Sequence, residues 1–178
     1  MDAHTTRAIL LRKIRYSDTS LIVKWCTLDH GLVKTMARGA LRPKSAFKGS
    51  LDLFFDAEIV FLRARKSELH TLKEVRVENP RLELRKSYLV TLVASYFVKL
   101  VDASVEPDAP VPGVFDLLGR AFDHLGSATP TRKTVLHFEK RLAGVLGVLS
   151  PDESPIRSLE GQGNKLPSDR KPLLDQLS

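Results

Sequence analysis

The amino-acid sequence predicts an α+β fold, with a small five-stranded barrel first and a helical domain after it. Apolar residues alternate with a period of two in much of the first 79 positions, and they recur at helical spacing after Asn79-Pro80. From Ser150 onward proline, serine and glycine accumulate, and no periodic apolar pattern continues. We therefore expect a barrel over residues 1–79, a helical domain over 80–149 and an irregular segment over 150–178.

Five short runs rich in β-branched, aliphatic and aromatic residues predict the strands. Turn-forming residues such as Ser17-Asp18-Thr19 and Asp29-His30-Gly31 separate the early runs. Five short strands within about 75 residues favour a small closed barrel. The expected strands cover Arg7–Ile14, Ser20–Leu28, Leu32–Arg38, Leu51–Leu62 and Leu69–Val77.

Three helices are expected in the second part. Apolar residues at helical spacing predict one continuous helix over Leu82–Ala103. A second helix follows, and Gly126 is expected to end it in a left-handed cap. Thr129-Pro130 has the composition of an N-cap and first-turn pair for a third helix. The apolar face of the third helix comprises Val135, Phe138, Leu142, Val145 and Leu149.

The most informative feature is a run of a single charge sign. The chain has a net charge of +7, and residues 1–79 hold 15 Lys/Arg against 9 Asp/Glu. Between Gly31 and Leu51 there is no acidic residue, and glycine and proline indicate a loop. A solubilising surface normally mixes both signs, so contact with nucleic acid is favoured over a merely solvated face. The cations of this run are Lys34, Arg38, Arg42, Lys44 and Lys48.

Aromatic residues near the cations are candidates for stacking on bases. Phe47 is a lone large apolar residue within the cationic loop, and Tyr16 lies in a polar turn after Arg12 and Arg15. We add these four residues to the expected nucleic-acid-binding set. The aromatic residues inside the predicted strands are expected in the core.

No residue pattern indicates catalysis. The sequence lacks the Gly-Lys-Ser/Thr of a Walker A loop, and its five histidines lack the close helical spacing of a metal pair. Cys26, the single cysteine, cannot form an intrachain disulfide or a multi-cysteine zinc site. Asp52 and Asp56 share a face of one predicted strand, and a solvated face is the simpler interpretation than a metal pair. We expect a protein that is not an enzyme and has no cofactor.

The N-terminus shows no basic-then-apolar export signal, and no uninterrupted apolar run reaches about 18 residues. We therefore expect a cytoplasmic protein with no membrane contact.

Several short motifs carry a family resemblance. They are Arg7-Ala8-Ile9-Leu10-Leu11-Arg12, Tyr16-Ser17-Asp18-Thr19-Ser20-Leu21-Ile22-Val23, His30-Gly31-Leu32, Ala37-Arg38-Gly39-Ala40, and Arg42-Pro43-Lys44-Ser45 with Phe47. Together they resemble the RecO family of bacterial recombinational repair proteins. The resemblance covers residues 5–78 well, and the helical remainder fits in outline.

The resemblance implies an N-terminal OB-fold, a helical domain, and binding of single- and double-stranded DNA. It further implies annealing of strands coated with single-stranded-DNA-binding protein (SSB), and cooperation with RecR to help load RecA. Lys34, Arg38, Arg42 and Lys44 fall where the family's DNA-contacting cations lie. A helical-domain groove for the acidic, apolar C-terminal tail of SSB is also implied.

One departure from the family pattern concerns zinc. Many members carry two Cys-x-x-Cys pairs where this chain has Ser150-Pro151-Asp152-Glu153. Either the lineage has lost its zinc or the chain is a shortened form, and we expect a short form without the zinc module. Two hypotheses follow: a mediator that binds DNA and anneals strands, or an adaptor that binds RecR or SSB and contacts DNA only weakly. The near-neutral helical half, with 13 Lys/Arg against 12 Asp/Glu over residues 80–178, favours the adaptor.

Overall fold

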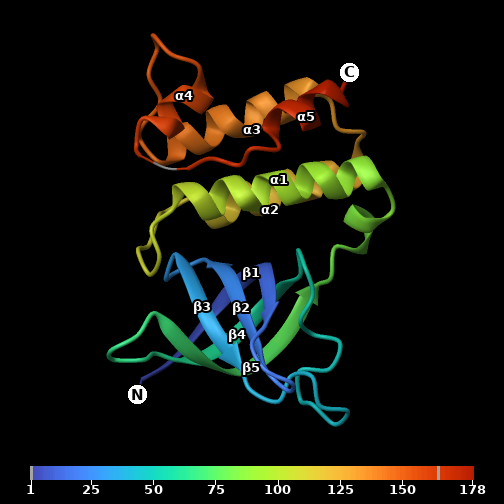
Figure 1. The fold of residues 1–178 in the computed structure, drawn as a ribbon, viewed down its shortest axis with the longest axis vertical. Helices are drawn as coiled ribbons and strands as arrows, with labels where there is room; N and C mark the ends of the chain where they lie inside the picture. The colour runs from blue at the N-terminus through green and yellow to red at the C-terminus, as the bar shows by residue number, and fades with distance from the viewer. Residues whose placement is uncertain (1, 164) are drawn as a thin grey trace. The chain divides into compact units, whose positions relative to one another are not determined.

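The structure is a computed structural model that describes residues 2–163 and 165–178. It divides into two compact units (Figure 1). The barrel unit comprises the chain up to Arg81 together with Glu106–Pro110, and the helical unit comprises Leu82–Val105 and Val111–Ser178. The α+β fold class expected from the sequence, a five-stranded barrel of OB type followed by helices, is confirmed.

Five strands close the barrel in the order β1-β2-β3-β5-β4. The long strand β1 pairs with both β2 and β4, so it takes part in two sides of the barrel. The pairing of β3 with β5 is parallel, and the other pairings are antiparallel. The strands are β1 (Ala3–Arg15), β2 (Leu21–Thr27), β3 (Leu32–Ala37), β4 (Asp56–Leu62) and β5 (Leu69–Asn79).

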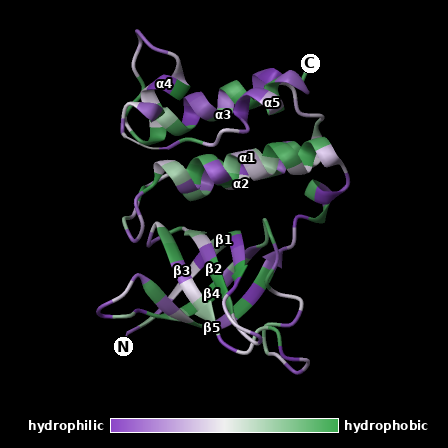
Figure 2. Ribbon diagram, in the orientation of Figure 1, coloured by the Kyte–Doolittle hydropathy of each residue, from purple (hydrophilic) through white to green (hydrophobic). Residues whose placement is uncertain are grey.

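Hydrophilic and hydrophobic residues alternate along the strands (Figure 2), and this alternation places side chains by turns in the barrel interior and on its outer surface. Along β3, Val33, Thr35 and Ala37 are buried, whereas the two residues between them are half-buried. The single buried polar group of Trp25 is satisfied, because its Nε1 donates to Thr35 Oγ1 at 2.9 Å. Inward positions of every strand therefore form one apolar core.

Strand β4 begins later than the sequence predicted. The expected strand over Leu51–Leu62 starts only at Asp56, because the backbone turns ahead of it and Phe54 adopts a left-handed φ of 71°. Leu51, Phe54 and Phe55 are nevertheless buried. The apolar run therefore predicts correctly that these residues are buried, but those before Asp56 are buried from a turn and not from a strand.

Asp56 is not on a solvated face. It is 3% exposed, and its Oδ2 lies 2.7 Å from Arg7 Nη2 and 3.5 Å from Arg81 Nη2. Arg81 is 4% exposed. The interpretation of Asp52 and Asp56 as one solvated pair is therefore wrong for Asp56, which is a buried ion-pair partner.

Residues Glu106–Pro110 belong to the barrel unit although they lie between two helices in the sequence. Asp108 N donates to Leu32 O at 2.8 Å, and the Asp108 carboxylate lies 2.9 Å from His70 Nε2. Gly31 faces this segment with a φ of +70°, and a Cβ at Gly31 would lie 2.1 Å from Ala109 O. Glycine is therefore required at position 31 for both its backbone angle and the close approach.

Among its described residues, the helical unit contains a short 3-10 helix and five α-helices. The continuous helix expected over Leu82–Ala103 is interrupted, because Ser87 caps the N-terminus of α1 by accepting from Val90 N. The second helix runs through Gly126, which does not form the expected left-handed cap. The third helix starts after Thr131, which forms a capping box with Thr134. The helices are η1 (Leu82–Arg85), α1 (Tyr88–Ser104), α2 (Val114–Ser127), α3 (Arg132–Val145), α4 (Pro155–Glu160) and α5 (Arg170–Asp175).

The described residues of the segment over 150–178, which was expected to be irregular, include regular structure. It contains α4 and α5, and its buried leucines include Leu159, Leu173 and Leu174. Arg170 of α5 holds the buried carboxylate of Glu139 with two hydrogen bonds of 2.7 and 2.8 Å. Tyr96 Oη donates to the same carboxylate at 2.7 Å. This buried cluster fixes the C-terminal segment to α3 and α1, which sequence periodicity alone could not indicate.

Candidate nucleic-acid interface

The outer face of β1, β2 and β3 carries a row of three cations. The strand register places Arg12 opposite Lys24 and Lys24 opposite Lys34, so the three residues lie side by side on adjacent strands. Like charges directly opposite one another repel, and an anion laid across the row relieves that repulsion. The Lys34 Nζ lies 3.4 Å from the exposed Glu68 carboxylate, a surface pair of small energetic weight.

Lys24 was not among the residues expected from the sequence. It stands alone between Val23 and Trp25, in a run that otherwise indicates a buried strand. Its position on the outer face follows from the alternation of β2, but its place between Arg12 and Lys34 depends on the register of three strands. The alternation of β2 could have placed Lys24 on the outer face of the barrel. Its pairing with Arg12 and Lys34 could not be predicted from the neighbouring residues alone.

An apolar row lies next to the cationic row. The register places Ile14 opposite Ile22 and Ile22 opposite Met36. Ile14 is 45% exposed, and the other two are half-buried. Tyr16, just past the end of β1, is 63% exposed. A face with cations, apolar side chains and an exposed ring offers both phosphate contacts and surfaces on which bases can stack.

The loop after β3 supplies the remaining expected cations. Successive turns shape it, with Arg42 N donating to Gly39 O and Ser45 N to Arg42 O, both at 3.0 Å. Four cations of the loop are exposed, and none of them forms an ion pair with another residue in the two described stretches, 2–163 and 165–178. Their charge is therefore available to an external anion. These cations are Arg38, Arg42, Lys44 and Lys48.

Two other expected residues behave differently. Arg15 is exposed, but its Nη2 lies 3.0 Å from the Asp18 carboxylate, so part of its charge is compensated locally. Phe47 is only 9% exposed and packs in the same core cluster as Trp25 and Phe61. The expectation that Phe47 is an exposed stacking ring is wrong. Burying a Phe side chain stabilises a fold by about 1.5–3 kcal/mol, and the turns of the loop direct this ring inward.

The helical unit contains a second candidate site, an open groove of about 590 Å³ lined by residues of α1, α2 and α3. Its floor is aromatic, because the rings of Phe97 and Phe138 stack with centroids 3.9 Å apart, although the two side chains are only 1% and 3% exposed. Neither Asp nor Glu lines it, whereas Arg120, Lys133 and Arg141 do. The lining therefore combines apolar surface with positive charge.

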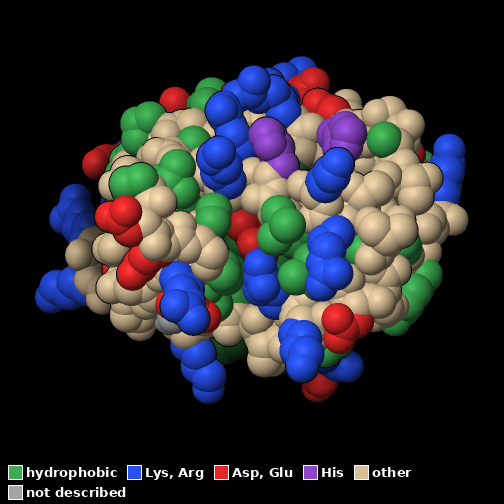
Figure 3. Space-filling view, turned by 90° about the horizontal axis from the view of Figure 1, so that it is seen from above, with side chains coloured by type: hydrophobic (Ala, Val, Ile, Leu, Met, Phe, Trp, Pro, Cys, Tyr) green, Lys and Arg blue, Asp and Glu red, His purple; other side chains and the backbone are tan. Residues whose placement is uncertain are grey.

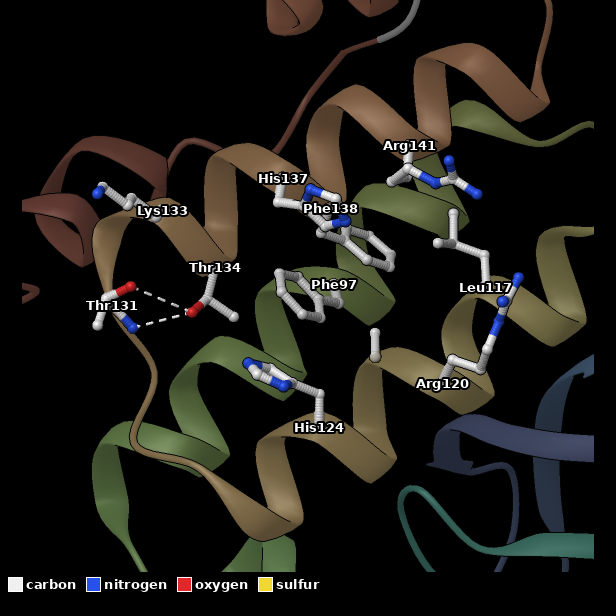
Figure 4. Close-up of a pocket in the computed structure, with 11 residues that line it drawn as sticks. Phe97, Leu117, Arg120, His124, Thr131, Lys133, Thr134, His137, Phe138 and Arg141 are labelled. Carbon is white, nitrogen blue, oxygen red and sulfur yellow. Dashed lines mark hydrogen bonds between the residues drawn. The ribbon is translucent and has the colours of Figure 1, made fainter.

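The cations lie around the aromatic floor of the groove (Figure 4). Arg120 is paired with Asp116 at 2.7 Å, but Lys133 and Arg141 are exposed. Figure 3 shows one face of the molecule on which Lys and Arg side chains, with two His, surround hydrophobic ones. Such a groove suits a peptide that carries both apolar side chains and carboxylates.

A closed five-stranded barrel with a cationic outer face is typical of proteins that bind nucleic acids through an OB-type fold. Comparison with protein families gives the particular family. A family model described as the N-terminal part of recombination protein O matches residues 1–81, and one for its C-terminal part matches residues 85–151. The chain therefore belongs to the RecO family of DNA repair proteins, as the sequence motifs indicated.

Curated relatives named "DNA repair protein RecO" agree with this assignment. The chain is 33% identical to the protein from Salinibacter ruber over 158 residues, which cover 88% of this chain and 61% of that relative. It is 34% identical to the protein from Syntrophus aciditrophicus over 135 residues, which cover 76% of this chain and 52% of the relative. The corresponding match in Bacillus subtilis is 29% identical and covers 79% of this chain and 54% of that protein. The chain thus spans between half and two thirds of these relatives.

The zinc module that the resemblance implies uses four cysteines, and this sequence contains one, Cys26. Cys26 is 1% exposed inside the barrel, and burial raises the pKa of its thiol to about 12, so it does not supply a thiolate ligand. Within residues 2–163 and 165–178, no group of three or more His, Cys, Asp and Glu is arranged to hold a metal ion. Over the same residues, no helix has the length and apolar character needed to cross a membrane.

Proposed function

We propose that this chain is a non-enzymatic mediator of recombinational repair that binds single- and double-stranded DNA through its barrel. In this proposal it promotes annealing of SSB-coated strands and, together with RecR, assists the loading of RecA. The observation that carries the proposal is the set of exposed cations in the loop after β3, which have no ion-pair partner among the described residues. The row formed by Arg12, Lys24 and Lys34 on the strands of the same barrel adds to this positive charge. Membership of the RecO family supports it.

The chemistry of annealing requires no nucleotide hydrolysis. Two strands repel each other through their phosphates, and cations that release the condensed counterions lower that repulsion. Apolar and aromatic groups on the same face hold bases unpaired while complementary sequences meet. Arg12, Ile14 and Tyr16 bring these two kinds of group together along one strand and the turn that follows it.

The test is a titration of labelled single strands and duplexes at several salt concentrations. If about six phosphates are contacted, duplex affinity should fall about 10³-fold between about 50 and about 200 mM salt. The protein should also accelerate pairing of complementary strands coated with SSB. Affinity that is weak and insensitive to salt would refute DNA binding by the barrel.

A second candidate function is that of an adaptor, which binds SSB or RecR and contacts DNA only weakly. The groove of the helical unit favours it, because Lys133 and Arg141 lie beside an apolar floor and no carboxylate lines it, which suits the acidic, apolar tail that the family is expected to bind. Under this alternative the tail peptide binds tightly while DNA does not.

The adaptor can be tested with a labelled SSB tail peptide and two neighbouring substitutions. Arg141→Glu places a negative charge in the groove and should weaken the peptide about 10-fold or more. Lys140→Glu changes the net charge equally but lies outside the lining of the groove, so it should leave binding nearly unchanged. Equal effects of the two substitutions would show that the peptide responds to net charge and not to the groove.

A further inference from the structure

A smaller cavity opens in the barrel unit between the β1–β2 turn and the loop after β3. Its volume is about 420 Å³, within the range of about 300–1,000 Å³ that pockets for small ligands occupy. One wall comes from the turn, the opposite wall comes from the loop, and Met36 of β3 contributes between them. The lining residues are Tyr16, Thr19, Ser20, Met36, Arg38, Gly39 and Arg42.

The two walls are joined by hydrogen bonds. Leu41 N donates to Thr19 O at 2.9 Å, and Gly39 N donates to Ser20 Oγ at 3.3 Å. Within the turn, Tyr16 N donates to Ser20 O at 3.0 Å. Gly39 has a φ of +70°, a left-handed angle that glycine adopts without strain. The pocket therefore exists before any ligand arrives, so less ordering is required on binding.

The chemistry of the walls is that of nucleotide recognition. Tyr16 presents an exposed ring, and Arg38 and Arg42 present two guanidinium groups that have no carboxylate partner within the described part of the chain. Guanidinium groups bind phosphate oxygens in a bidentate manner, and aromatic rings stack on unpaired bases. No acidic residue lines the pocket to oppose a phosphate.

We propose that this pocket is a subsite for one unstacked nucleotide of a single strand, with the base on Tyr16 and the adjoining phosphates on Arg38 and Arg42. The inference rests on the proposed binding of DNA by the barrel and adds a strand preference to it. A base within a duplex is paired and stacked, and it cannot reach the ring without being extruded at a cost of a few kcal/mol. The apolar row that begins with the exposed Ile14 and continues through the half-buried Ile22 and Met36 extends this surface for neighbouring bases.

The experiment compares the full chain with its Tyr16→Leu and Tyr16→Phe variants on a short poly(dT) strand and on a duplex. Tyr16→Leu should weaken single-strand binding about 5- to 150-fold, the equivalent of ~1–3 kcal/mol for one stacked base, with an unchanged salt slope. Duplex binding should stay the same, and Tyr16→Phe should retain most of the single-strand affinity. Tyr88→Leu is the matched control, because Tyr88 is 76% exposed in the helical unit, and it should change neither.

A strand with one long abasic stretch makes the test specific for stacking. If Tyr16 holds a base, removing the bases and removing the ring eliminate the same contact, so the two losses should not add. Additive losses, or equal loss on duplex and single strand, would overturn the subsite. If the unmodified chain binds neither DNA, the proposed function fails first, and that outcome is distinguishable because it does not depend on Tyr16.

Discussion

Neutralising Arg38 and Arg42 together should lower both the affinity of the barrel for DNA and its dependence on salt. Both side chains are exposed and have no ion-pair partner in the described part of the chain, so substitution by Gln removes two charges without breaking a contact that supports the fold. Each lost phosphate contact reduces the slope of log K against log salt by about 0.7 on single strands and about 0.9 on duplex. In the double variant, the magnitude of the slope should therefore fall by about 1.4 on single strands and by about 1.8 on duplex.

These slopes translate into affinities. Counterion release contributes little near 1 M salt, so the variant and the parent chain should bind almost equally there. At a tenfold lower salt concentration the difference in slope becomes a difference in affinity of about 25-fold on single strands and about 60-fold on duplex. The effect should be the same for all base sequences, because phosphate contacts carry no sequence information.

Fluorescence anisotropy of labelled strands over a series of salt concentrations measures both quantities. The double substitution Arg65→Gln with Lys66→Gln is the matched control, because both residues are exposed on the same barrel unit, between β4 and β5, and the change in net charge is identical. The reasoning would be refuted if the control reduced the slope as much as the test variant. An unchanged slope in the test variant would show that the acid-free loop is only a solvated surface.

Three further changes test the fold around the sites. Phe47→Ala should destabilise the chain by about 3–5 kcal/mol in urea unfolding and leave the salt slope of DNA binding unchanged; a stable variant with weakened single-strand binding would instead place the ring at the surface. Arg170→Ala leaves the carboxylate of Glu139 buried with only the Tyr96 hydroxyl, so a loss of about 3–5 kcal/mol is expected, and adding Glu139→Gln should restore part of it. Burial of the His30 ring is the main cause that lowers its pKa below the ordinary value of 6.5, and repulsion from His4 is the second. The unfolded chain therefore protonates His30 at a higher pH than the folded chain does. Stability should therefore decline as pH falls below 6.5, and His30→Gln should flatten that decline, whereas an identical pH profile for both chains would contradict the assignment.

The strand and helix pattern could be predicted from sequence because periodicity is a local property. The alternation that predicted β3 and the helical spacing that predicted α3 are both properties of a few successive residues. Predictions failed where one backbone angle or one cap decided the boundary. Phe54 adopts a left-handed φ within an apolar run and delays the start of β4, and Ser87 starts a new helix within a stretch of helical composition. Neither residue type requires that conformation by itself.

The candidate site could be predicted in part, for a similar reason. Clustered charge is visible in the sequence, so the cations after β3 were found. Burial is not visible in the sequence in the same way. Phe47 has charged neighbours in the sequence but lies in the core. Arg81 has a sequence context similar to that of Arg85, but it is 4% exposed and lies 3.5 Å from the carboxylate of Asp56. Lys24 was missed because its membership of the cationic row exists only once three strands are paired.

Both candidate sites are cationic, and what separates their ligands is the apolar surface beside the charge. In the groove, Phe97 (1% exposed) and Phe138 (3% exposed) form a largely buried floor and the cations lie around them, so the lining combines apolar surface with charge. On the barrel face, Arg38 and Arg42 are exposed, and the charges dominate, so a flexible polyanion gains most by spreading along them. In the proposed functions, a strand binds mainly through its phosphates on the barrel face, whereas an acidic peptide adds its apolar side chains to the charge contacts in the groove. The two proposed functions therefore use different cations, Arg38 and Arg42 for a strand and Lys133 and Arg141 for an acidic tail.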